Sequence, residues 1–509
     1  MTRNAHSETV AAAAQADTKK VLDVLVIGTG FAGVCVGIKL LEKGITNFRI
    51  YEKSQGIGGT WYDNTYPGAA CDVPSHFYGY SFEPNPNWSR VYSPQAEIQE
   101  YIERCVDKHG LRRHIVHDMR VTRMRLDEAR GLWMVSFANG KTVEAHHVIN
   151  GFGGLHQPLM PSIPGRDSFA GPSMHTRTWD HSVDLVNKRV AVIGSAASAI
   201  QVIPELARIA ANVTVFQRTP NYILPRGDRA YTDKEKRRFA HWPWIQRLYR
   251  WWLYKRMDVL TFPIIKKDSK MGEKASARVI EHMRKSIRDP AMHAHMEPAY
   301  AMGCKRMLLS DDLFRALNRD NVQTELTGIA SIEPGGVRTA DGKLHAADVI
   351  IYATGFDVEG HQRSIEVFGR GGRSLNEDWA HCAAAYRGTC VAGYPNYWLV
   401  TGPNTGVATT SIVFMIEQTV RFIVRMVEAA GNTRLVEVKK GAQDAYNAWL
   451  QEQMKDTVWV SGCKSFYLNA EGKVTTLFPG NARSFRRLLA RIRWSDFEVS
   501  EPARMDRAA

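Results

Sequence analysis

The sequence predicts an α/β fold built from two similar strand-helix-strand units, with a helical segment inserted after the second. Three observations predict it: a glycine-bearing unit begins at Leu22, a unit with the same plan begins at Lys188, and long helical periodicity fills about 224–301. The chain has 509 residues, enough for a large core and for two or three domains.

The first unit has an apolar strand, the motif Gly28-x-Gly30-x-x-Gly33, an apolar helix and a second strand ending at Glu52. Gly28 allows a tight turn, Gly30 lets the backbone approach a pyrophosphate, and Gly33 lets helix and strand pack closely. The helix N-terminus offers free N–H groups to phosphates. The Glu52 carboxylate can accept hydrogen bonds from a ribose and repels a 2'-phosphate. The unit is therefore predicted to bind the ADP half of FAD or NAD.

The second unit repeats this plan and ends in a base. Arg218 follows Gly194 by 24 positions (218 − 194), as Glu52 follows Gly28 by 24 (52 − 28). A base in the place of the acid suits a ribose that carries a 2'-phosphate, so the second unit is predicted to prefer NADPH.

The second glycine motif departs from the first, because Ala196 and Ala199 stand at its other two glycine places. Alanine is an accepted variant at the third place, whereas at the second it weakens the motif. The internal repeat restores the prediction of a dinucleotide unit.

The net charge is +14 and the sequence pI is about 9.4. A positive charge of this size suggests nucleic acid, a membrane surface or anionic cofactors as candidate partners. The basic residues are scattered and no nucleic-acid motif is present, so we favour a solvated cationic surface that attracts dinucleotides over nucleic-acid binding.

Seven cysteines are widely spaced and form no Cys-x-x-Cys pair. This spacing supports neither a zinc site nor a flavin-linked dithiol, so no metal is expected. We expect reduced thiols and a cytoplasmic location. Residues 1–20 are predicted to be a flexible tail, and no run of 18 apolar residues predicts a membrane span.

Between the two units, a glycine-, proline- and aromatic-rich stretch after Glu52 predicts an irregular packed loop. A helix is expected after Ser93-Pro94, followed by strands around residues 119–126, 132–137 and 141–150. The last of these strands closes the first dinucleotide domain at Gly151.

The insertion contains an unusual tryptophan-rich helix within residues 241–257. Apolar side chains lie near one helical face and basic ones surround it; they are Trp244, Leu248, Trp251 and Trp252, with Arg247, Arg250, Lys255 and Arg256. Such a helix can lie on a membrane surface. We favour the alternative, the core of a helical subdomain or a lid over a substrate channel.

After the insertion, strands resume at Asn321 and end before Thr354-Gly355, where the second dinucleotide domain should close. A long amphipathic helix and a basic C-terminal helix follow, the latter expected to dock on its own domain. The predicted boundaries are a tail at 1–20, an FAD-binding domain at 21–158 and 384–509, an NADPH-binding domain at 159–223 and 311–383, and a helical insertion at 224–310.

Two motifs make the chain resemble the Baeyer-Villiger monooxygenases, which use NADPH and oxygen to turn ketones into esters or lactones. One is the family fingerprint Phe169-x-Gly171-x-x-x-His175-x-x-x-Trp179-Asp180, and the other is Gly58-Gly59-x-Trp61-x-x-x-x-Tyr66-Pro67-Gly68-x-x-x-Asp72. Related N- and S-oxidising enzymes usually have another aromatic residue at the place of Trp179. The likeness covers about residues 22–430.

The resemblance implies roles for individual residues. A third stretch, Gly303-Cys304-Lys305-Arg306, is similar to the family segment in which the lysine contacts the NADP 2'-phosphate and the arginine is catalytic. Asp72 would be the counter-charge that positions Arg306. His175 and Trp179 would relay NADPH binding into domain closure, and Phe169 and Gly171 belong to the same supporting fingerprint.

The expected cofactor contacts fall into two sets. FAD would meet Gly28, Gly30, Gly33, Glu52, Thr60, Trp61, Asp72, Tyr78, Val121 and Gln157. NADPH would meet Gly194, Ser195, Ser198, Arg218, Thr219, Lys305 and Arg306.

Two other functions stay open at this point. One is a flavin monooxygenase that oxidises sulfur or nitrogen, and the other is a non-catalytic flavin- and nucleotide-binding protein associated with membranes through the basic aromatic insertion. The resemblance implies a small-molecule ketone and O2 as substrates, and neither the ketone nor the oligomeric state follows from the sequence.

Overall fold

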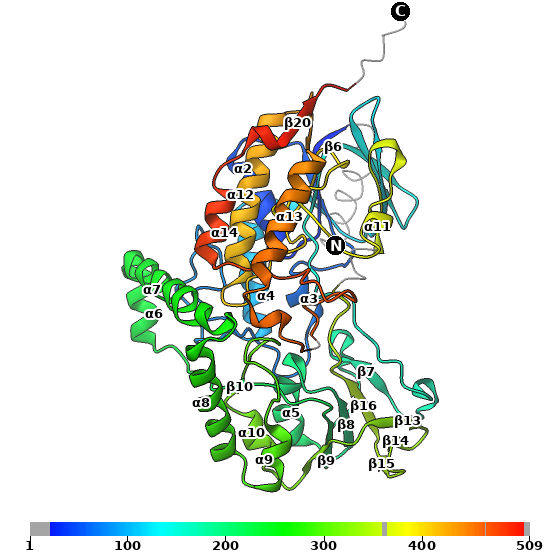
Figure 1. Ribbon diagram of the computed structural model, residues 1–509, viewed down its shortest axis with the longest axis vertical. Coiled ribbons are helices and arrows are strands. Elements are labelled where there is room, and N and C mark those ends of the chain that lie inside the picture. The colour runs from blue at the N-terminus through cyan, green and yellow to red at the C-terminus, as the bar shows by residue number, and fades with distance from the viewer. Residues whose placement is uncertain (1–20, 359–363, 464, 503–509) are drawn as a thin grey trace, which may run out of the picture.

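The computed structural model describes residues 21–358, 364–463 and 465–502, and the chain forms two α/β halves, the upper and lower parts of Figure 1. The predicted tail, residues 1–20, lies outside the described residues. An eight-stranded sheet organises the upper half and a five-stranded sheet the lower half. The predicted α/β class with two similar units is confirmed.

The first sheet has the strand order β17-β4-β5-β6-β1-β2-β3, and β18 also pairs with β6. Its strands are β1 (Leu22–Ile27), β2 (Phe48–Tyr51), β3 (Ile115–Val116), β4 (Val121–Asp127), β5 (Leu132–Phe137), β6 (Thr142–Asn150), β17 (Glu366–Phe368) and β18 (Tyr397–Leu399). β1 lies in parallel between β2 and β6. Val24, Leu25 and Val26 are fully buried, as expected for a parallel strand covered on both faces.

Helices cover the first sheet: α2 (Phe31–Glu42), α4 (Gln95–Lys108), α12 (Ile412–Ala430), α13 (Lys440–Met454) and α14 (Ala482–Leu489). α12 packs against α2 and α14. α14 buries Phe485 and Leu489 and leaves its arginines exposed, so the predicted docking of the C-terminal helix on its own half is confirmed. Shorter elements complete this half: α3 (Thr60–Asp63), α11 (Leu375–Asp378), β19 (Leu435–Val438) and β20 (Phe497–Ser500).

The second sheet has the order β12-β9-β8-β16-β7 and is parallel throughout. Its strands are β7 (Ser173–His175), β8 (Arg189–Ile193), β9 (Asn212–Phe216), β12 (Val322–Glu325) and β16 (Val349–Tyr352). α5 (Ala197–Ile209) joins β8 to β9 and packs against α10 (Leu313–Leu317). A separate antiparallel sheet contains β13 (Ile329–Glu333), β14 (Gly336–Thr339) and β15 (Leu344–Ala346).

The chain returns to the first sheet earlier than predicted. β17 pairs in parallel with β4, so residues 366–368 belong to the first sheet, and the expected boundary at 383/384 is wrong. The return lies between the end of β16 at Tyr352 and the start of β17 at Glu366. A three-residue strand has too short an apolar pattern to be recognised from sequence, which explains the error.

One part of the insertion packs against the first half and another part packs against the second half. It leaves and rejoins through the parallel pair β10 (Ile223–Leu224) and β11 (Leu308–Leu309), and contains α6 (Asp233–His241), α7 (Pro243–Lys255), the π-helix η4 (Arg256–Thr261), α8 (Lys270–Ser286) and α9 (Ala291–Met296). Leu253 of α7 joins a core of the first half. Met283 of α8 and Met296 of α9 join the core of the second half. Figure 1 shows α6 and α7 projecting from the side of the molecule.

The apolar face of the tryptophan-rich helix is not the core of a subdomain, which corrects that interpretation. Trp244, Leu248, Trp251 and Trp252 are 61%, 55%, 54% and 47% exposed. α7 turns its other face toward the first half. No helix within the described residues is long and apolar enough to cross a membrane.

Candidate functional site

The first glycine loop leaves bare backbone beside the N-terminus of α2. Gly28 has φ of 90°, in the left-handed region that favours glycine. A Cβ on Gly33 would lie 1.8 Å from the Gly28 carbonyl oxygen, and one on Gly59 would lie 3.0 Å from the Cα of Gly30. The Gly58-Gly59 stretch therefore packs directly on the first glycine motif. A surface without side chains at a helix N-terminus fits a pyrophosphate.

Glu52 is held at the end of β2, next to this loop. It is only 4% exposed. Thr29 donates to Glu52 Oε2 from its backbone N at 2.9 Å and its Oγ1 at 2.8 Å, and the Ser54 N–H donates to Oε1 at 2.9 Å. The Met119 N–H donates to the Glu52 carbonyl at 2.9 Å, which brings Val121, at the start of β4, to the same end of the sheet. A fixed carboxylate here fits a ribose hydroxyl.

The aromatic loop after Gly59 brings Trp61 and Tyr78 together. The Trp61 indole N–H donates to the Tyr78 hydroxyl at 3.2 Å, and their rings meet edge to face with centroids 5.7 Å apart. Thr60 begins α3 immediately after the glycines. Gln157 lies instead on the connection between the halves, where its carbonyl accepts a hydrogen bond from the Asp357 N–H at 2.9 Å.

The second glycine loop has the same backbone requirement with fewer glycines. Gly194 has φ of 114°, and a Cβ there would lie 2.4 Å from the Ala353 carbonyl oxygen. Ser195 Oγ donates to the Thr219 carbonyl at 3.3 Å. Asn221 donates to the Ser195 carbonyl at 3.0 Å, a contact that sequence reasoning missed. The loop thus places Ser195 beside Thr219, two of the residues expected to contact NADPH.

The first half reaches across to α5 through Tyr66 and Gly68. Tyr66 donates from its hydroxyl to Gln201 Oε1 at 2.7 Å. Burial raises the pKa of Tyr66, and a hydrogen bond with Ser198 opposes that rise. A Cβ on Gly68 would lie 2.5 Å from the Gln201 carbonyl oxygen. The Tyr66-Pro67-Gly68 stretch therefore forms a contact between the halves. Position 68 needs glycine because a side chain there would collide with the backbone of α5.

Two cations converge at the second loop. Burial lowers the pKa of Lys305, and the nearby Arg218 guanidinium lowers it further. Lys305 Nζ lies 4.8 Å from the centroid of the Tyr300 ring. Among the described residues, neither Lys305 nor Arg218 makes an ion pair with a carboxylate. Two adjacent positive charges with no carboxylate partner in the described part of the chain would suit a dianion such as a 2'-phosphate.

Arg306 and Asp72 form an ion pair between the halves. The Nε and Nη2 atoms of Arg306 donate to Asp72 Oδ2 at 3.1 and 2.5 Å. The Asp72 carboxylate is the main cause that raises the pKa of Arg306, so the guanidinium stays charged at every working pH. The Arg306 side chain keeps 43% of its surface exposed. Nη1 has no hydrogen-bond partner among the described residues, so the cation can bind a second group.

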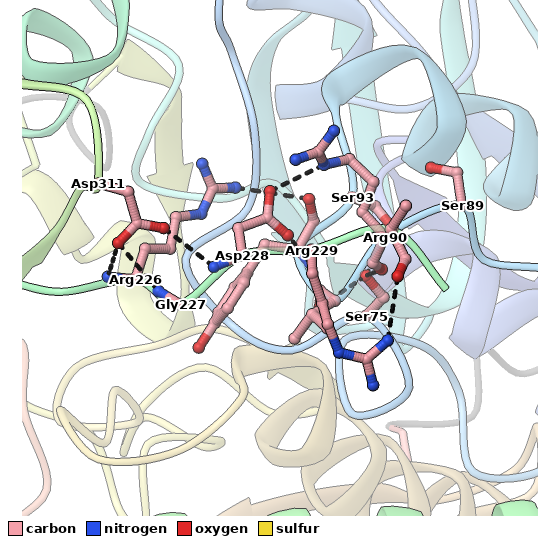
Figure 2. A network of polar contacts seen from close by, with 12 residues as sticks. Ser75, Ser89, Arg90, Ser93, Arg226, Gly227, Asp228, Arg229 and Asp311 are labelled. Atoms are coloured by element: carbon pink, nitrogen blue, oxygen red, sulfur yellow. Dashed lines mark hydrogen bonds and ion pairs between the residues drawn. The ribbon is translucent and has the colours of Figure 1, made fainter. Parts of the chain in front are cut away.

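A polar network fixes the chain before Asp72, as Figure 2 shows in part. Asp311 accepts hydrogen bonds of 2.8 to 3.0 Å from three consecutive backbone N–H groups, those of residues 226–228. Arg226 Nη2 then donates to the Cys71 carbonyl at 3.0 Å. Arg90 Nε donates to Asp228 Oδ2 at 2.8 Å. The network joins the start of the insertion to the residue that precedes Asp72, and sequence reasoning missed it because its members lie far apart in the chain.

A disulfide joins Cys304 to Cys463 and corrects the expectation that all seven thiols are reduced. Cys304 lies two positions before Arg306, and Cys463 belongs to the loop that follows α13. The same loop brings Tyr467 close to the ion pair: burial raises the pKa of Tyr467 to about 12, and the Arg306 guanidinium opposes the rise. The disulfide therefore ties the C-terminal loop to the segment that carries Arg306. The bonded cysteines are 159 positions apart, so no local spacing could indicate the pair.

We expect thiol titration of the denatured, unreduced chain to give five thiols, because the disulfide removes two of seven. Cys463→Ser should lower the free energy of unfolding by about 2–4 kcal/mol, since the bond constrains a long loop in the unfolded chain. Denaturant unfolding measures this loss, with Cys382→Ser as the control that leaves the bond intact. A titration of seven thiols would show that the bond does not form.

The fingerprint residues lie at the edge of the second sheet. His175 ends β7 and is 2% exposed, and burial lowers its pKa to about 4, so it is neutral at neutral pH. Its Nδ1 accepts a hydrogen bond from the Arg177 N–H at 3.0 Å. A Cβ on Gly171 would lie 2.4 Å from the Asp348 carbonyl oxygen. Phe169 and Trp179 pack against separate cores of the second half.

Arg177, inside the fingerprint, makes a contact between the halves that sequence reasoning missed. Its Nη2 lies 2.6 Å from Asp63 Oδ2, with the two side chains 16% and 8% exposed. Burial raises the pKa of Asp63 and Arg177 lowers it. Asp63 belongs to α3, next to Trp61. The fingerprint is thereby connected to the aromatic loop of the first half through one ion pair.

Arg177→Met should destabilise the protein by about 3–5 kcal/mol, because it leaves the Asp63 carboxylate buried without its partner. The expected signs are a lower denaturant midpoint and a raised KM for NADPH. Arg208→Met, which breaks the exposed Arg208–Glu205 pair, should change stability by about 1 kcal/mol or less. Equal effects of the two substitutions would mean that the pair between the halves has no special role.

The chain is similar to known proteins over most of its length. Residues 25–228 match the family model described as pyridine nucleotide-disulphide oxidoreductase, although the chain has no Cys-x-x-Cys pair. Two proteins named Baeyer-Villiger monooxygenase are similar over 94% of the chain. The one from Pseudomonas aeruginosa is 39% identical with 91% of its length covered, and the one from Streptomyces coelicolor is 38% identical with 93% covered.

A solved structure resembles the whole chain. The crystal structure of cyclohexanone monooxygenase from Rhodococcus sp. Phi1 bound to NADP+ superposes with a TM-score of 0.85 at 30% identity and covers 95% of this chain and 99% of that one. Fold, fingerprint and the two named relatives agree, and this chain belongs to the Baeyer-Villiger monooxygenases.

Proposed function

We propose that this protein is an FAD- and NADPH-dependent monooxygenase that inserts one oxygen atom of O2 beside a ketone carbonyl to give an ester or lactone. One observation carries the proposal: Arg306 meets Asp72 where the two halves contact each other. Arg306 directly follows Lys305 of the cationic pair, and Asp72 is the last residue of the motif that begins with Gly58-Gly59, where Gly59 packs on Gly30. A permanent cation thus lies at a contact between the two halves.

The residues that would hold each cofactor belong to different halves. In the first half, the bare glycine loop, the fixed Glu52 carboxylate and the Trp61–Tyr78 pair fit FAD. In the second half, the Gly194 loop and the cations Arg218 and Lys305 fit NADPH. When bound, FAD supplies the ring that activates O2 and NADPH supplies the hydride.

The role of Arg306 follows from its fixed charge. Oxygen transfer to a ketone develops negative charge on oxygen, and a guanidinium already in place stabilises that charge without reorganisation. Asp72 accepts two of the Arg306 hydrogen bonds and so holds its orientation. Arg226 in turn fixes the backbone before Asp72. Tyr467, on the C-terminal loop, lies close enough to the ion pair to raise the pKa of Arg306 further.

The proposal is tested by product analysis. FAD-loaded protein with NADPH and isotopically labelled O2 is offered cyclic, linear and aryl ketones, with a thioether as the competing substrate. We expect esters or lactones that carry one labelled oxygen. Sulfoxide as the sole product would favour the sulfur-oxidising alternative. Oxygen uptake that does not respond to any substrate would favour a non-catalytic nucleotide-binding protein.

A further inference from the structure

The outward face of α7 is apolar. Trp244, Leu248 and Trp251 follow one another at helical spacing and Trp252 lies beside them, each about half exposed or more. The preceding Trp242 is 54% exposed, and Val259 and Leu260 of η4 are each 56% exposed. Single exposed apolar residues are ordinary, but a row of tryptophans on one projecting helix marks an interaction surface.

The inward face of the same helix carries polar side chains beside the buried Leu253. Gln246 is buried and donates to the Asn85 carbonyl at 2.7 Å. Arg250 donates to the His76 carbonyl at 2.8 Å and lies 4.0 Å from the buried Glu417 carboxylate. The helix therefore turns hydrogen-bonded polar groups toward the protein and tryptophans toward solvent. This inward face makes the contacts of α7 with the core of the first half, so core packing does not explain the tryptophans.

Positive charge surrounds the tryptophan face. From position 236 to 260 the sequence has seven basic residues, of which only Arg250 belongs to the inward face. The one acid in this stretch, Asp258, is buried and accepts a hydrogen bond from the Ala482 N–H at 2.7 Å. Lys255 and Arg256 lie over the rings of Trp251 and Trp252, with centroid distances of 5.8 and 5.5 Å. The positive surface continues onto α14, where three arginines are exposed: Arg483, Arg486 and Arg487. Two of them, Arg483 and Arg486, lower the pKa of Tyr254 in α7, so α14 lies close to α7.

We infer that this face docks on the surface of a lipid bilayer that contains anionic phospholipid. Tryptophan prefers the boundary between headgroups and acyl chains, and flanking Lys and Arg bind anionic headgroups. A second copy of the chain fits less well, because a two-fold contact through this face would bring the same basic residues against each other. The inference concerns attachment and does not depend on the proposed reaction.

Co-sedimentation with vesicles tests the inference on the full-length, FAD-loaded protein. Vesicles of phosphatidylcholine with about 30 mol% phosphatidylglycerol should bind the protein roughly tenfold or more better than pure phosphatidylcholine, and salt should weaken the binding. On the anionic vesicles, tryptophan fluorescence should shift to shorter wavelength.

Two sets of variants distinguish binding through the tryptophan face of α7 from nonspecific binding through exposed tryptophans elsewhere. Replacing Trp244, Trp251 and Trp252 by serine should lower binding roughly tenfold or more, since these rings would enter the interface. The matched control replaces by serine two tryptophans that are exposed on other parts of the protein, Trp449 (44% exposed) and Trp494 (46% exposed). This control should bind the vesicles like the unaltered protein. Because all these side chains are exposed, thermal unfolding and activity without vesicles should not change.

Three outcomes would overturn the inference. The first is equal binding to both kinds of vesicle, and the second is equal loss of binding in the two variant sets. The third is concentration-dependent self-association that disappears in the Trp244, Trp251 and Trp252 variant while no vesicle binding occurs, which would assign the face to a second copy.

Discussion

Arg306→Ala should lower the rate of ester formation by about 10²- to 10³-fold, the loss typical of one preorganised donor to developing charge. Reduction of the protein by NADPH should continue, because Lys305 and Arg218 are unaltered, so NADPH oxidation should become uncoupled from product. Stopped-flow reduction followed by product quantification separates the two steps. The substitution also leaves the Asp72 carboxylate without the cation that now binds it.

Two further variants make this prediction sharper. Arg306→Lys keeps a charge but not two adjacent donors from one planar group, so it should recover only part of the lost rate. Arg493→Ala removes an exposed arginine outside the site and should behave like the unaltered protein. If Arg306→Ala formed ester at an undiminished rate, Arg306 would have no role in the proposed oxygen transfer.

The parts of this molecule that the sequence predicted correctly are those with local physical requirements. Gly28 needs positive φ, Gly33 needs the absence of a Cβ, and Glu52 must follow a short parallel strand. These constraints lie within one βαβ unit, so a single stretch of sequence contains them. The repeat at Gly194 and Arg218 was visible for the same reason.

The parts that were missed depend on contacts between distant segments. The direction of the α7 tryptophans could not be predicted, because periodicity defines two faces but not which one is buried. Here Asn85, His76 and Glu417 from other segments satisfy Gln246 and Arg250, and this face is the buried one. Leu253 on the same helix joins the core.

The ion pair between Arg177 and Asp63 was missed for a similar reason. Its two residues come from different halves, and lone charges in a sequence are usually solvated. The position of Arg177 inside a complete fingerprint was the one signal that could have found it.

Replacing both Arg218 and Lys305 by alanine should lower the preference for NADPH over NADH by about 100-fold or more, as the ratio of kcat/KM values. Each charge-assisted contact with the 2'-phosphate contributes about 1.5–3 kcal/mol, and two such contacts correspond to about two to four orders of magnitude. NADH lacks that phosphate, so its kcat/KM should change little. Each single variant should lose only part of the preference.

The cause of this preference is visible in the protein before coenzyme binds. Burial and the nearby Arg218 guanidinium lower the pKa of Lys305, and a dianion between the two cations would relieve their repulsion. Salt should therefore weaken binding of NADPH more than binding of NADH. Lys267→Ala, at an exposed lysine of the same insertion, is the control and should keep the full preference. If the double variant still selected NADPH as strongly as the unaltered protein does, the 2'-phosphate would have to bind elsewhere, and the assignment of the second unit would be wrong.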